Sequence, residues 1–520
     1  MSKCFLLALI ISILPLNRVY CSWQKDLGLL LASNNQEEIN ILITKVLKEK
    51  PNWRDVISFI KNSTWQKPDK TGIVIEKKIM CSDGITRPYI TFIPSSYDPA
   101  TPTPLVVYLH GGVSRTEIRD DRIEYAERKE YMRLAKKNGW MMVFPFGQKG
   151  ATWWDSVGMK NILNIVRKTK RDYNIDDDRV WMTGFSDGAS ASFLFSMIYP
   201  TDFAAFVPLS GHMGVGGLSG KLPLYPANMS MSPLHAINTD IDNLYPAAKM
   251  RKMIDMARDA GANIHYREYN GIGHDFGYAD EELPRIESFL DRNPRNSLPH
   301  HIEWKTGKSE FGKSYWLKIN GISIGEPPAP WHIDSNLSLI DDRVSFGFFP
   351  DYEYEGSGVK VDGLSDGDTV SRRMGLKPAD IIIKCNEMNI LTIDDLDAFK
   401  VSVKRGEHIN VVVKRSNQDV LLEGKIPNSE TYLLFPRETP SAAVIADFMA
   451  NTFSLETSRY GHGSILIHPD MVQLDQDVVV KLDGNTVFNG RIEPDIKFIL
   501  KHYLENRDRK LLYVKEIMIQ

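Results

Sequence analysis

The clearest chemical signal in this 520-residue sequence is a serine placed between two glycines. Ser186 lies in the segment GFSDG, which directly follows the apolar run Arg179–Thr183 and precedes a segment rich in small residues. A strand, a sharp turn and a helix in this order form a nucleophile elbow, in which the serine hydroxyl projects above the end of a sheet. A bare GxSxG pattern also arises by chance, because glycine and serine are common residues. The motif therefore predicts a nucleophile only in combination with suitable partners downstream.

Candidate partners follow in the order that the chemistry needs. His274 lies in the glycine-rich segment NGIGHDF after an apolar run, and two carboxylates precede it in TDIDNLYP. A histidine can take the proton of a serine hydroxyl and return it to the leaving group, and a carboxylate orients the imidazole. Asp242 and Asp240 compete for this last role, and the D-x-x-Φ-P spacing before Pro246 favours Asp242. We predict a triad of Ser186, Asp242 and His274, with Asp240 as a loop-capping or solvated carboxylate.

A second glycine turn predicts an oxyanion hole. The apolar run PLVVYL leads directly into His110-Gly111-Gly112. Backbone N–H groups of Gly111 and Gly112, together with the N–H of Asp187, could stabilise the charge that develops on a carbonyl oxygen. We expect His110 to pack and hydrogen-bond beneath this turn rather than to act in catalysis.

Other aromatic and histidine residues give weaker signals. Trp153 and Trp154 could stack on an aromatic or sugar-like substrate, or could equally lie in the core. His212 is a further candidate for the wall of a substrate pocket. The pair His300-His301 has no nearby partner at metal-ligand spacing, so we predict neither a metal nor another cofactor.

A parallel sheet would bring these residues together, and the sequence pattern predicts one. Between Ile73 and Asn293, short apolar runs alternate with amphipathic segments, which is typical of βαβ units. The expected strands are Leu105–Leu109, Trp140–Phe144, Arg179–Thr183, Phe203–Pro208, Leu234–Asn238 and Asn263–Tyr269. The predicted fold class is therefore α/β, with the candidate residues on loops at the carboxyl ends of strands.

The length allows about three to four folded units, and five regions differ in pattern. The expected divisions are a signal peptide at 1–21, a helical segment at 22–72, the α/β region at 73–296, a β-rich domain at 297–336 and 428–520, and a separate domain at 337–427. In the β-rich part we expect EWKTG and SYWLKI to pair with GSILIHPD and DVVVKLDG in one sandwich. Asp483-Gly484 is the cue for a tight hairpin.

Composition and the first residues indicate the class of protein and its destination. The chain is 42% hydrophobic with a net charge of −3, which gives no electrostatic footprint for nucleic acid. Lys3 and the apolar run Cys4–Leu16 predict a secretory signal cleaved after Cys21, with lipid attachment at Cys21 as the alternative. We therefore expect a secreted or periplasmic protein with no integral membrane segment after cleavage. Cys81 and Cys385 would then remain, in different domains and without a disulfide framework.

Taken together, these segments resemble a known group of enzymes. The chain is similar to the polyhydroxybutyrate depolymerase-like and feruloyl or acetylxylan esterases. The segments that carry this similarity are HGG, WWDSVGMKNIL, DDDRVWMTGFSDG, the D-x-x-Y-P loop and GIGHDFG. This resemblance covers about Ile73 to Asn293 and implies an α/β-hydrolase fold related to the catalytic domain of prolyl oligopeptidases. One departure is Ala189, where the relatives commonly have glycine.

A second resemblance covers about Leu337 to Pro427, which is similar to a PDZ domain of the bacterial type. It implies that Phe346, Gly347 and Phe348 form the loop whose backbone amides receive the carboxylate of a C-terminal peptide. Ala379 stands where such domains usually have glycine, so we expect strain at that turn.

Three functions are compatible with these patterns. The leading hypothesis is a secreted serine hydrolase that cleaves carboxylic esters through an acyl-enzyme on Ser186. The same triad could serve a peptidase of the prolyl oligopeptidase type, although an amide needs stronger acid catalysis for its poorer leaving group. The third hypothesis is a binding protein in which only the PDZ-like domain acts, on a C-terminal peptide ligand.

Overall fold

The computed structural model describes residues 21–351 and 354–520 of the chain. Contacts divide them into two units. The first holds the residues up to Asp240 together with Ala247–Ser335 and Phe435–Gln520, and the second holds Ile241–Pro246 and Asn336–Leu434. Apart from Cys21, the predicted signal segment lies outside the described residues.

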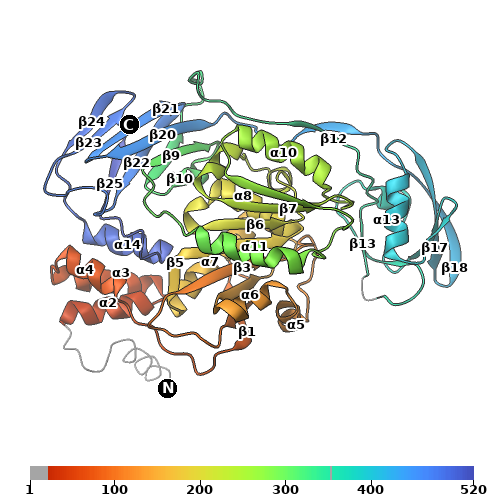
Figure 1. The fold of residues 1–520 in the computed structure, drawn as a ribbon, viewed down its shortest axis with the longest axis horizontal. Helices are drawn as coiled ribbons and strands as arrows, with labels where there is room; N and C mark the ends of the chain where they lie inside the picture. The colour runs from red at the N-terminus through yellow and green to blue at the C-terminus, as the bar shows by residue number, and fades with distance from the viewer. Residues whose placement is uncertain (1–20, 352–353) are drawn as a thin grey trace. The chain divides into compact units, whose positions relative to one another are not determined.

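A mixed eight-stranded sheet lies at the centre of the first unit (Figure 1). Its strand order is β1-β2-β4-β3-β5-β6-β7-β8. The strands β3 to β8 are parallel to one another, while β1 and β2 form an antiparallel hairpin at one edge, where β2 pairs with β4 in antiparallel fashion. The bounds are β1 Ile73–Met80, β2 Thr86–Ile93, β3 Thr103–Leu109, β4 Met141–Pro145, β5 Ile175–Phe185, β6 Ala205–Leu209, β7 Leu234–Thr239 and β8 Ile264–Tyr269. Every strand run expected from the sequence is present, and the predicted α/β class is confirmed.

Helices cover both faces of this sheet because parallel strands are joined by crossovers. The helices α6 and α11 pack on one face through a shared apolar core, and Figure 1 shows them on the same side. The helix α8 is almost wholly buried and contacts β3, β5 and β6. The bounds are α5 Arg122–Glu127, α6 Tyr131–Asn138, α7 Ser156–Asp172, α8 Asp187–Ile198, α9 Val215–Gly220, α10 Ala247–Asp259 and α11 Ala279–Arg292, with short 3₁₀ turns η2 Pro200–Asp202 and η3 Pro226–Met231.

The β-rich part of the first unit is built from two segments of the chain, one before and one after Asn336–Leu434 of the second unit. Strand β9 pairs with β20, with Trp304 opposite Val444, and β11 pairs with β22, with Leu317 opposite Ile465. The two sheets have the orders β24-β23-β21-β20-β9 and β10-β11-β22-β25. The bounds are β9 His301–Thr306, η4 Ser309–Phe311, β10 Lys313–Ser314, β11 Leu317–Ile322, β20 Ala442–Met449, β21 Thr452–Ser458, β22 Tyr460–Ile467, β23 Val478–Leu482, β24 Asn485–Gly490, α14 Ile496–Asn506 and β25 Lys515–Ile519.

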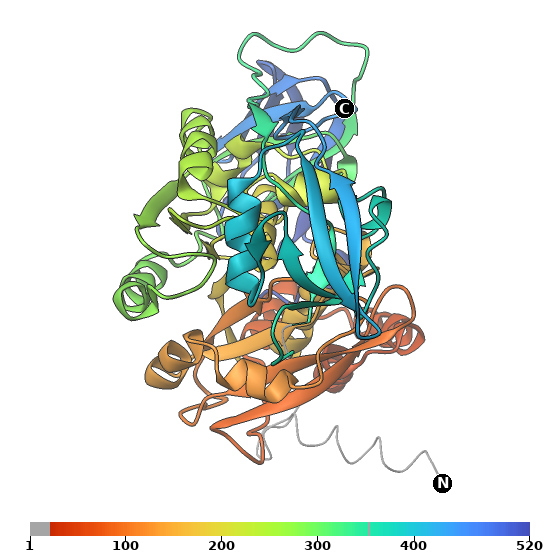
Figure 2. The same cartoon turned by 90° about the vertical axis from the view of Figure 1, so that its right-hand side faces the viewer.

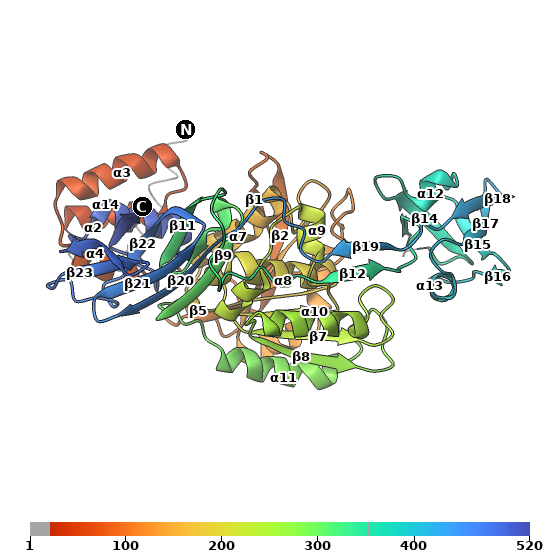
Figure 3. The ribbon, with the colours of Figure 1, turned by 90° about the horizontal axis from the view of Figure 1, so that it is seen from above.

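The N-terminal helices share a core with these sheets. The helices are α2 Ser22–Ala32, α3 Gln36–Lys48 and α4 Trp53–Lys61. Buried residues such as Leu30, Val46 and Ile60 belong to one cluster with Trp304 and Leu500 of the β-rich part. Figure 3 shows α3 and α14 beside strands of that part. None of the helices within residues 21–351 and 354–520 is long and apolar enough to span a membrane.

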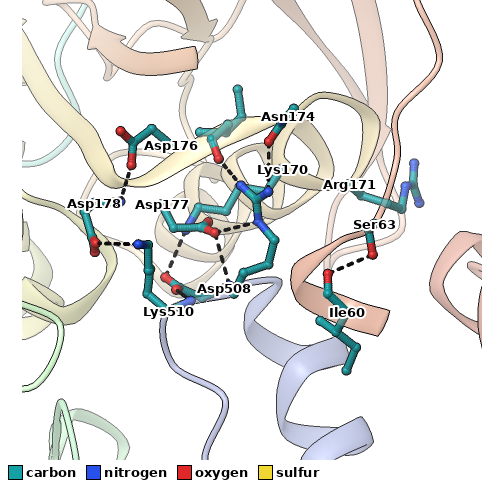
Figure 4. A network of polar contacts seen from close by, with 12 residues as sticks. Ile60, Ser63, Lys170, Arg171, Asn174, Asp176, Asp177, Asp178, Asp508 and Lys510 are labelled. Atoms are coloured by element: carbon teal, nitrogen blue, oxygen red, sulfur yellow. Dashed lines mark hydrogen bonds and ion pairs between the residues drawn. The ribbon is translucent and has the colours of Figure 1, made fainter. Parts of the chain in front are cut away.

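Buried charges connect the β-rich part to the amino end of β5 (Figure 4). Asp508 accepts from Lys170 Nζ at 3.1 Å and from Arg295 Nη1 at 2.8 Å. Arg509 Nε donates to Asp177 at 2.9 Å. The side chains of Lys170, Asp508 and Arg295 are at most 5% exposed. The network therefore joins residues that lie more than 200 positions apart in the sequence.

The second unit has its own core of apolar residues, including Phe346, Val361 and Phe399. A six-stranded sheet has the order β13-β14-β15-β17-β18, with β16 paired to β15. It packs against the helix α13, which Figure 2 shows in cyan. Ala379 has a φ of +68°, in the left-handed region that glycine adopts more easily, so the strain expected at this turn is present. The bounds are β12 Ser338–Asp341, β13 Phe348–Pro350, β14 Val359–Leu364, α12 Val370–Arg373, β15 Ile381–Cys385, β16 Met388–Asn389, α13 Ile393–Ser402, β17 His408–Arg415, β18 Gln418–Lys425 and β19 Glu430–Leu433. Cys81 and Cys385 are free thiols in different units.

Candidate active site

The turn between β5 and α8 has the geometry of a nucleophile elbow. Strand β5 ends at Phe185, α8 begins at Asp187, and Ser186 between them has φ 58° and ψ −117°. Residues other than glycine rarely adopt a positive φ, and such strain is concentrated at functional sites. The strained backbone presents the Ser186 side chain at the amino end of α8, where the sequence motif predicts it.

The glycines of the motif are required by a neighbouring strand. A β carbon on Gly188 would lie 2.0 Å from the carbonyl oxygen of Leu109, and one on Gly184 would lie 2.6 Å from the same atom. The elbow therefore packs directly against the end of β3. The methyl group of Ala189 fits because residue 211 is also a glycine. A β carbon on Gly211 would lie only 2.4 Å from the Ala189 Cβ.

The structure brings the predicted nucleophile and base together. His274 Nε2 lies 2.9 Å from Ser186 Oγ, which is hydrogen-bond distance. The ring of His274 also packs against Phe185, with 4.9 Å between the ring centroids. A base within hydrogen-bond distance of a serine hydroxyl is the arrangement that activates this weak nucleophile.

The loop that carries His274 is held by two residues from the end of β7. The Thr239 hydroxyl donates to the carbonyl of Gly273 at 2.8 Å, and the N–H of Gly271 donates to the Asp240 carboxylate at 2.8 Å. Asp240 thus caps the histidine loop. The role of Thr239 is not predictable from the sequence, because a threonine at a strand end gives no signal by itself.

The third predicted member of the triad is buried. Asp242 is 1% exposed, and its Oδ1 accepts the N–H groups of Leu244 and Tyr245 at 2.8 Å each. It lies in the segment Ile241–Pro246, which is grouped with the second unit. Its place in a triad stays a prediction.

The predicted oxyanion turn closely approaches the nucleophile. A β carbon on Gly111 would lie 2.8 Å from the Cβ of Ser186, so only glycine fits there. Beneath the turn, His110 Nε2 accepts the N–H of Gly147 at 3.0 Å, which leaves the ring proton on Nδ1, 2.7 Å from the carbonyl oxygen of Gly111. Burial lowers the pKa of His110 to about 4, so the ring is neutral at pH 7. The role of Gly111, Gly112 and Asp187 as an oxyanion hole stays a prediction.

The candidates for contact with a substrate are Trp153, Trp154 and His212. Trp153 is fully buried, and its Nε1 donates to the carbonyl of His110 at 2.9 Å. Its ring therefore has no exposed surface for a substrate in this conformation. Trp154 and His212 retain 8% and 9% exposure, and a substrate-contact role for them stays a prediction. Within residues 21–351 and 354–520, no group of three or more His, Cys, Asp or Glu side chains is arranged to hold a metal ion.

Comparisons with known proteins point to esterases. No protein-family model matches the chain. The chain is 29% identical over 164 residues to the bifunctional acetylxylan esterase/xylanase XynS20E of Neocallimastix patriciarum, covering 31% of this chain and 22% of that protein. It is 30% identical over 98 residues to acetylxylan esterase A of Aspergillus oryzae, covering 17% of this chain and 32% of that protein. The chain thus spans about a fifth to a third of the length of these relatives. Among solved structures, a thermostable esterase matches 43% of this chain and 63% of its own at 20% identity, with a TM-score of 0.36.

Proposed function

We propose that this protein is a serine hydrolase that cleaves carboxylic esters. The observation that carries the proposal is the 2.9 Å contact between His274 Nε2 and Ser186 Oγ at a strained strand–helix elbow. The similarity to acetylxylan esterases supports an ester as the substrate. Acetyl esters of sugars are therefore the first substrate class to test.

The mechanism follows from the positions of these groups. His274 takes the proton of Ser186 as the hydroxyl oxygen attacks the ester carbonyl, and the resulting oxyanion is stabilised by the N–H groups of the Gly111-Gly112 turn and of Asp187. The tetrahedral intermediate collapses, the alcohol leaves with the proton from His274, and the acyl group stays on Ser186. Water, deprotonated by His274, then attacks the acyl-enzyme and releases the carboxylic acid. Asp242 would hold the imidazole in the correct tautomer and stabilise its charged form.

The direct test is labelling and turnover of the purified protein. We expect a fluorophosphonate to modify Ser186 and p-nitrophenyl acetate to be hydrolysed, and Ser186→Ala to abolish both. Ser288→Ala is the matched control, because Ser288 is an exposed residue of α11. A wild-type protein that is neither labelled nor active would contradict the proposal and favour a binding protein. Cleavage of chromogenic peptides without ester hydrolysis would favour a peptidase.

We also propose that the second unit binds the carboxylate end of a peptide. The N–H groups of Ser345, Phe346 and Gly347 donate no hydrogen bond within the part of the chain that the structure describes. Gly347 has a φ of +79°, and successive free N–H groups around such a residue can form an anion-binding nest. The edge strand β13 directly follows this loop and could accept an added strand. Binding to a C-terminal peptide library that is lost when the carboxylate is amidated would support this role, and equal binding of amidated peptides would contradict it.

The destination of the protein is a proposal too. We infer export from the basic and apolar segment before Cys21, as the sequence pattern predicts. Amino-terminal sequencing of the protein recovered from a secreting host tests this, and we expect a chain that begins just after Cys21. A mature chain that begins with Cys21 and carries lipid would support the alternative anchor.

A further inference from the structure

A hydrogen bond joins the turn that follows β3 to a side chain of the nucleophile elbow. The N–H of Val113 donates to the Asp187 carboxylate oxygen Oδ2 at 2.9 Å. Asp187 is the residue directly after Ser186 and the first residue of α8. The bond therefore connects two segments that are 74 residues apart in the sequence and that both border the serine hydroxyl.

A second set of bonds holds the same turn from beneath. His110 contacts the carbonyl oxygen of Gly111 through Nδ1 and the N–H of Gly147 through Nε2. The described peptide bonds are all trans, so the carbonyl of Gly111 and the N–H of Gly112 point in opposite directions. Because the His110 ring engages the carbonyl, the Gly112 N–H is directed away from the ring. Gly112 has a φ of +65°. It is exposed, so packing of neighbouring side chains does not hold it in place.

These bonds matter because an oxyanion hole depends on the distance between two donors. One donor would come from the turn after β3 and the other from the N–H of Asp187 on α8. Donors of this kind act only when they are already placed around the position of the oxyanion. Loop segments move unless side chains or packing hold them. A bond between the turn and α8 removes the relative motion that would change the separation of the donors.

We propose that Asp187 acts twice in the reaction. Its backbone N–H is one donor of the oxyanion hole, and its carboxylate is a strap that holds the turn carrying the other donor. The inference rests on the proposed esterase function, which it deepens. In the second role Asp187 is a positioning residue, since its carboxylate acts through the turn at Val113 rather than on the substrate. This second role explains why the fourth residue of GFSDG is an aspartate. The spacing of glycine, serine and glycine in the motif does not explain it.

Two variants separate the strap from the charge. Asp187→Asn keeps an oxygen that can accept the Val113 N–H, whereas Asp187→Leu has a similar volume without an acceptor. We expect Asp187→Leu to lower kcat for p-nitrophenyl acetate by about 100-fold or more, as the loss of one oxyanion donor does, with KM changed by only a few fold. Asp187→Asn should keep kcat within about tenfold of the wild type, because the backbone donor and the strap both remain.

Affinity for a trifluoromethyl ketone, whose adduct on Ser186 carries an oxyanion, gives a second readout. It should weaken in Asp187→Leu in parallel with kcat/KM, because the adduct needs the same donors. Amide hydrogen exchange across residues 110–115 should become faster in this variant and stay near the wild-type rate in Asp187→Asn. Thermal unfolding of both variants checks that they are folded.

The outcomes are distinguishable from a failure of the proposed function. If the wild type hydrolyses the ester but Asp187→Leu keeps wild-type kcat and inhibitor affinity, the strap is wrong and the esterase proposal stands. Equal losses in Asp187→Asn and Asp187→Leu would also overturn the strap, because the charge rather than the bond would then matter. A wild type that is neither labelled by a fluorophosphonate nor active would overturn both proposals.

Discussion

At the scale of single residues, the candidate site depends on small groups that allow close approach of the backbone. Gly111 lies against Ser186, and Gly188 lies against the carbonyl of Leu109, at distances that no side chain could tolerate. These contacts let the turn after β3 and the amino end of α8 meet around one hydroxyl. The surroundings of Ser186 are thus set as much by the residues that lack side chains as by His274, the proposed base.

The two acidic residues of the loop after β7 give the first prediction. We expect Asp242→Asn to lower kcat for p-nitrophenyl acetate by about 10³–10⁴-fold, because an amide does not stabilise the imidazolium or its correct tautomer. Asp240→Asn is the matched control. Its oxygen can still accept the Gly271 N–H, so kcat should fall by less than about tenfold. Steady-state kinetics on both variants measure the difference, and the reverse ranking would assign the triad carboxylate to Asp240.

At the scale of elements, the most unusual contact is the buried charge network between β5 and the segment after α14. Burial alone would raise the pKa of Asp508, but Arg295 and Lys170 hold it well below its usual range. Buried ions that keep their partners are tolerated, whereas removal of one partner leaves an uncompensated charge. The network therefore joins the β-rich part to the α/β sheet through groups that each need their partners.

The second prediction concerns this network. Asp508→Asn should lower the free energy of unfolding by about 3–5 kcal/mol, because it removes one charge from a buried group of ions. Chemical denaturation at pH 7 measures the change. Asp291→Asn, at an exposed position of α11, is the control and should change stability by less than about 0.5 kcal/mol.

The same network predicts a dependence on pH. The carboxyl of Asp508 has a lower pKa in the folded chain than in the unfolded chain, where the pKa of an aspartate is about 3.9. Its contribution to stability is thus present above about pH 4 and is lost as the pH falls towards the folded value. Denaturation curves between pH 6 and pH 3 should show a shallower loss of stability in Asp508→Asn than in the wild type. Equal slopes for the two proteins would contradict this assignment.

At the scale of the whole molecule, Asn336–Leu434 of the second unit is an insertion whose two ends are joined to each other. Strands β12 and β19 pair in antiparallel fashion, and the N–H of Leu434 donates to the carbonyl of Leu337 at 2.9 Å. In the first unit, Arg437 Nη2 donates to the carbonyl oxygens of Leu224 and Ser335 at 2.7 Å and 2.9 Å. The outgoing and returning segments are therefore tied together on the side of the first unit as well.

The fourth prediction follows from these joined ends. We expect residues 336–434 alone to unfold in one cooperative transition, because they have their own apolar core. A chain in which a short glycine–serine linker replaces Leu337–Leu434 should also fold, since closing a loop between adjacent ends costs little. Thermal melts followed by circular dichroism test both proteins. A shortened chain that aggregates while the isolated unit folds would show that the first unit needs the insertion.

The sequence by itself determined the local backbone of this protein. The apolar runs between Leu105 and Tyr269 are the strands of the sheet, and GFSDG forms the strained elbow. Asp483-Gly484 forms the expected hairpin, with positive φ at both residues. SYWLKI pairs with GSILI as expected, whereas the strand of EWKT is separated from VVVKL by two strands of the same sheet. These features are readable because each depends on the period of apolar residues or on a φ that few residue types adopt.

Only the tertiary structure decided which distant groups meet. The order of the motifs had already predicted that His274 meets Ser186. The tertiary structure alone placed the Asp187 carboxylate on Val113 and the N-terminal helices in the core of the β-rich sheets. It also assembled Lys170, Arg295 and Asp508 into one buried network. Such pairings depend on which buried surfaces and charges complement one another in three dimensions. Local sequence periodicity carries no record of that complementarity, because it reflects only the conformation of a short stretch of chain.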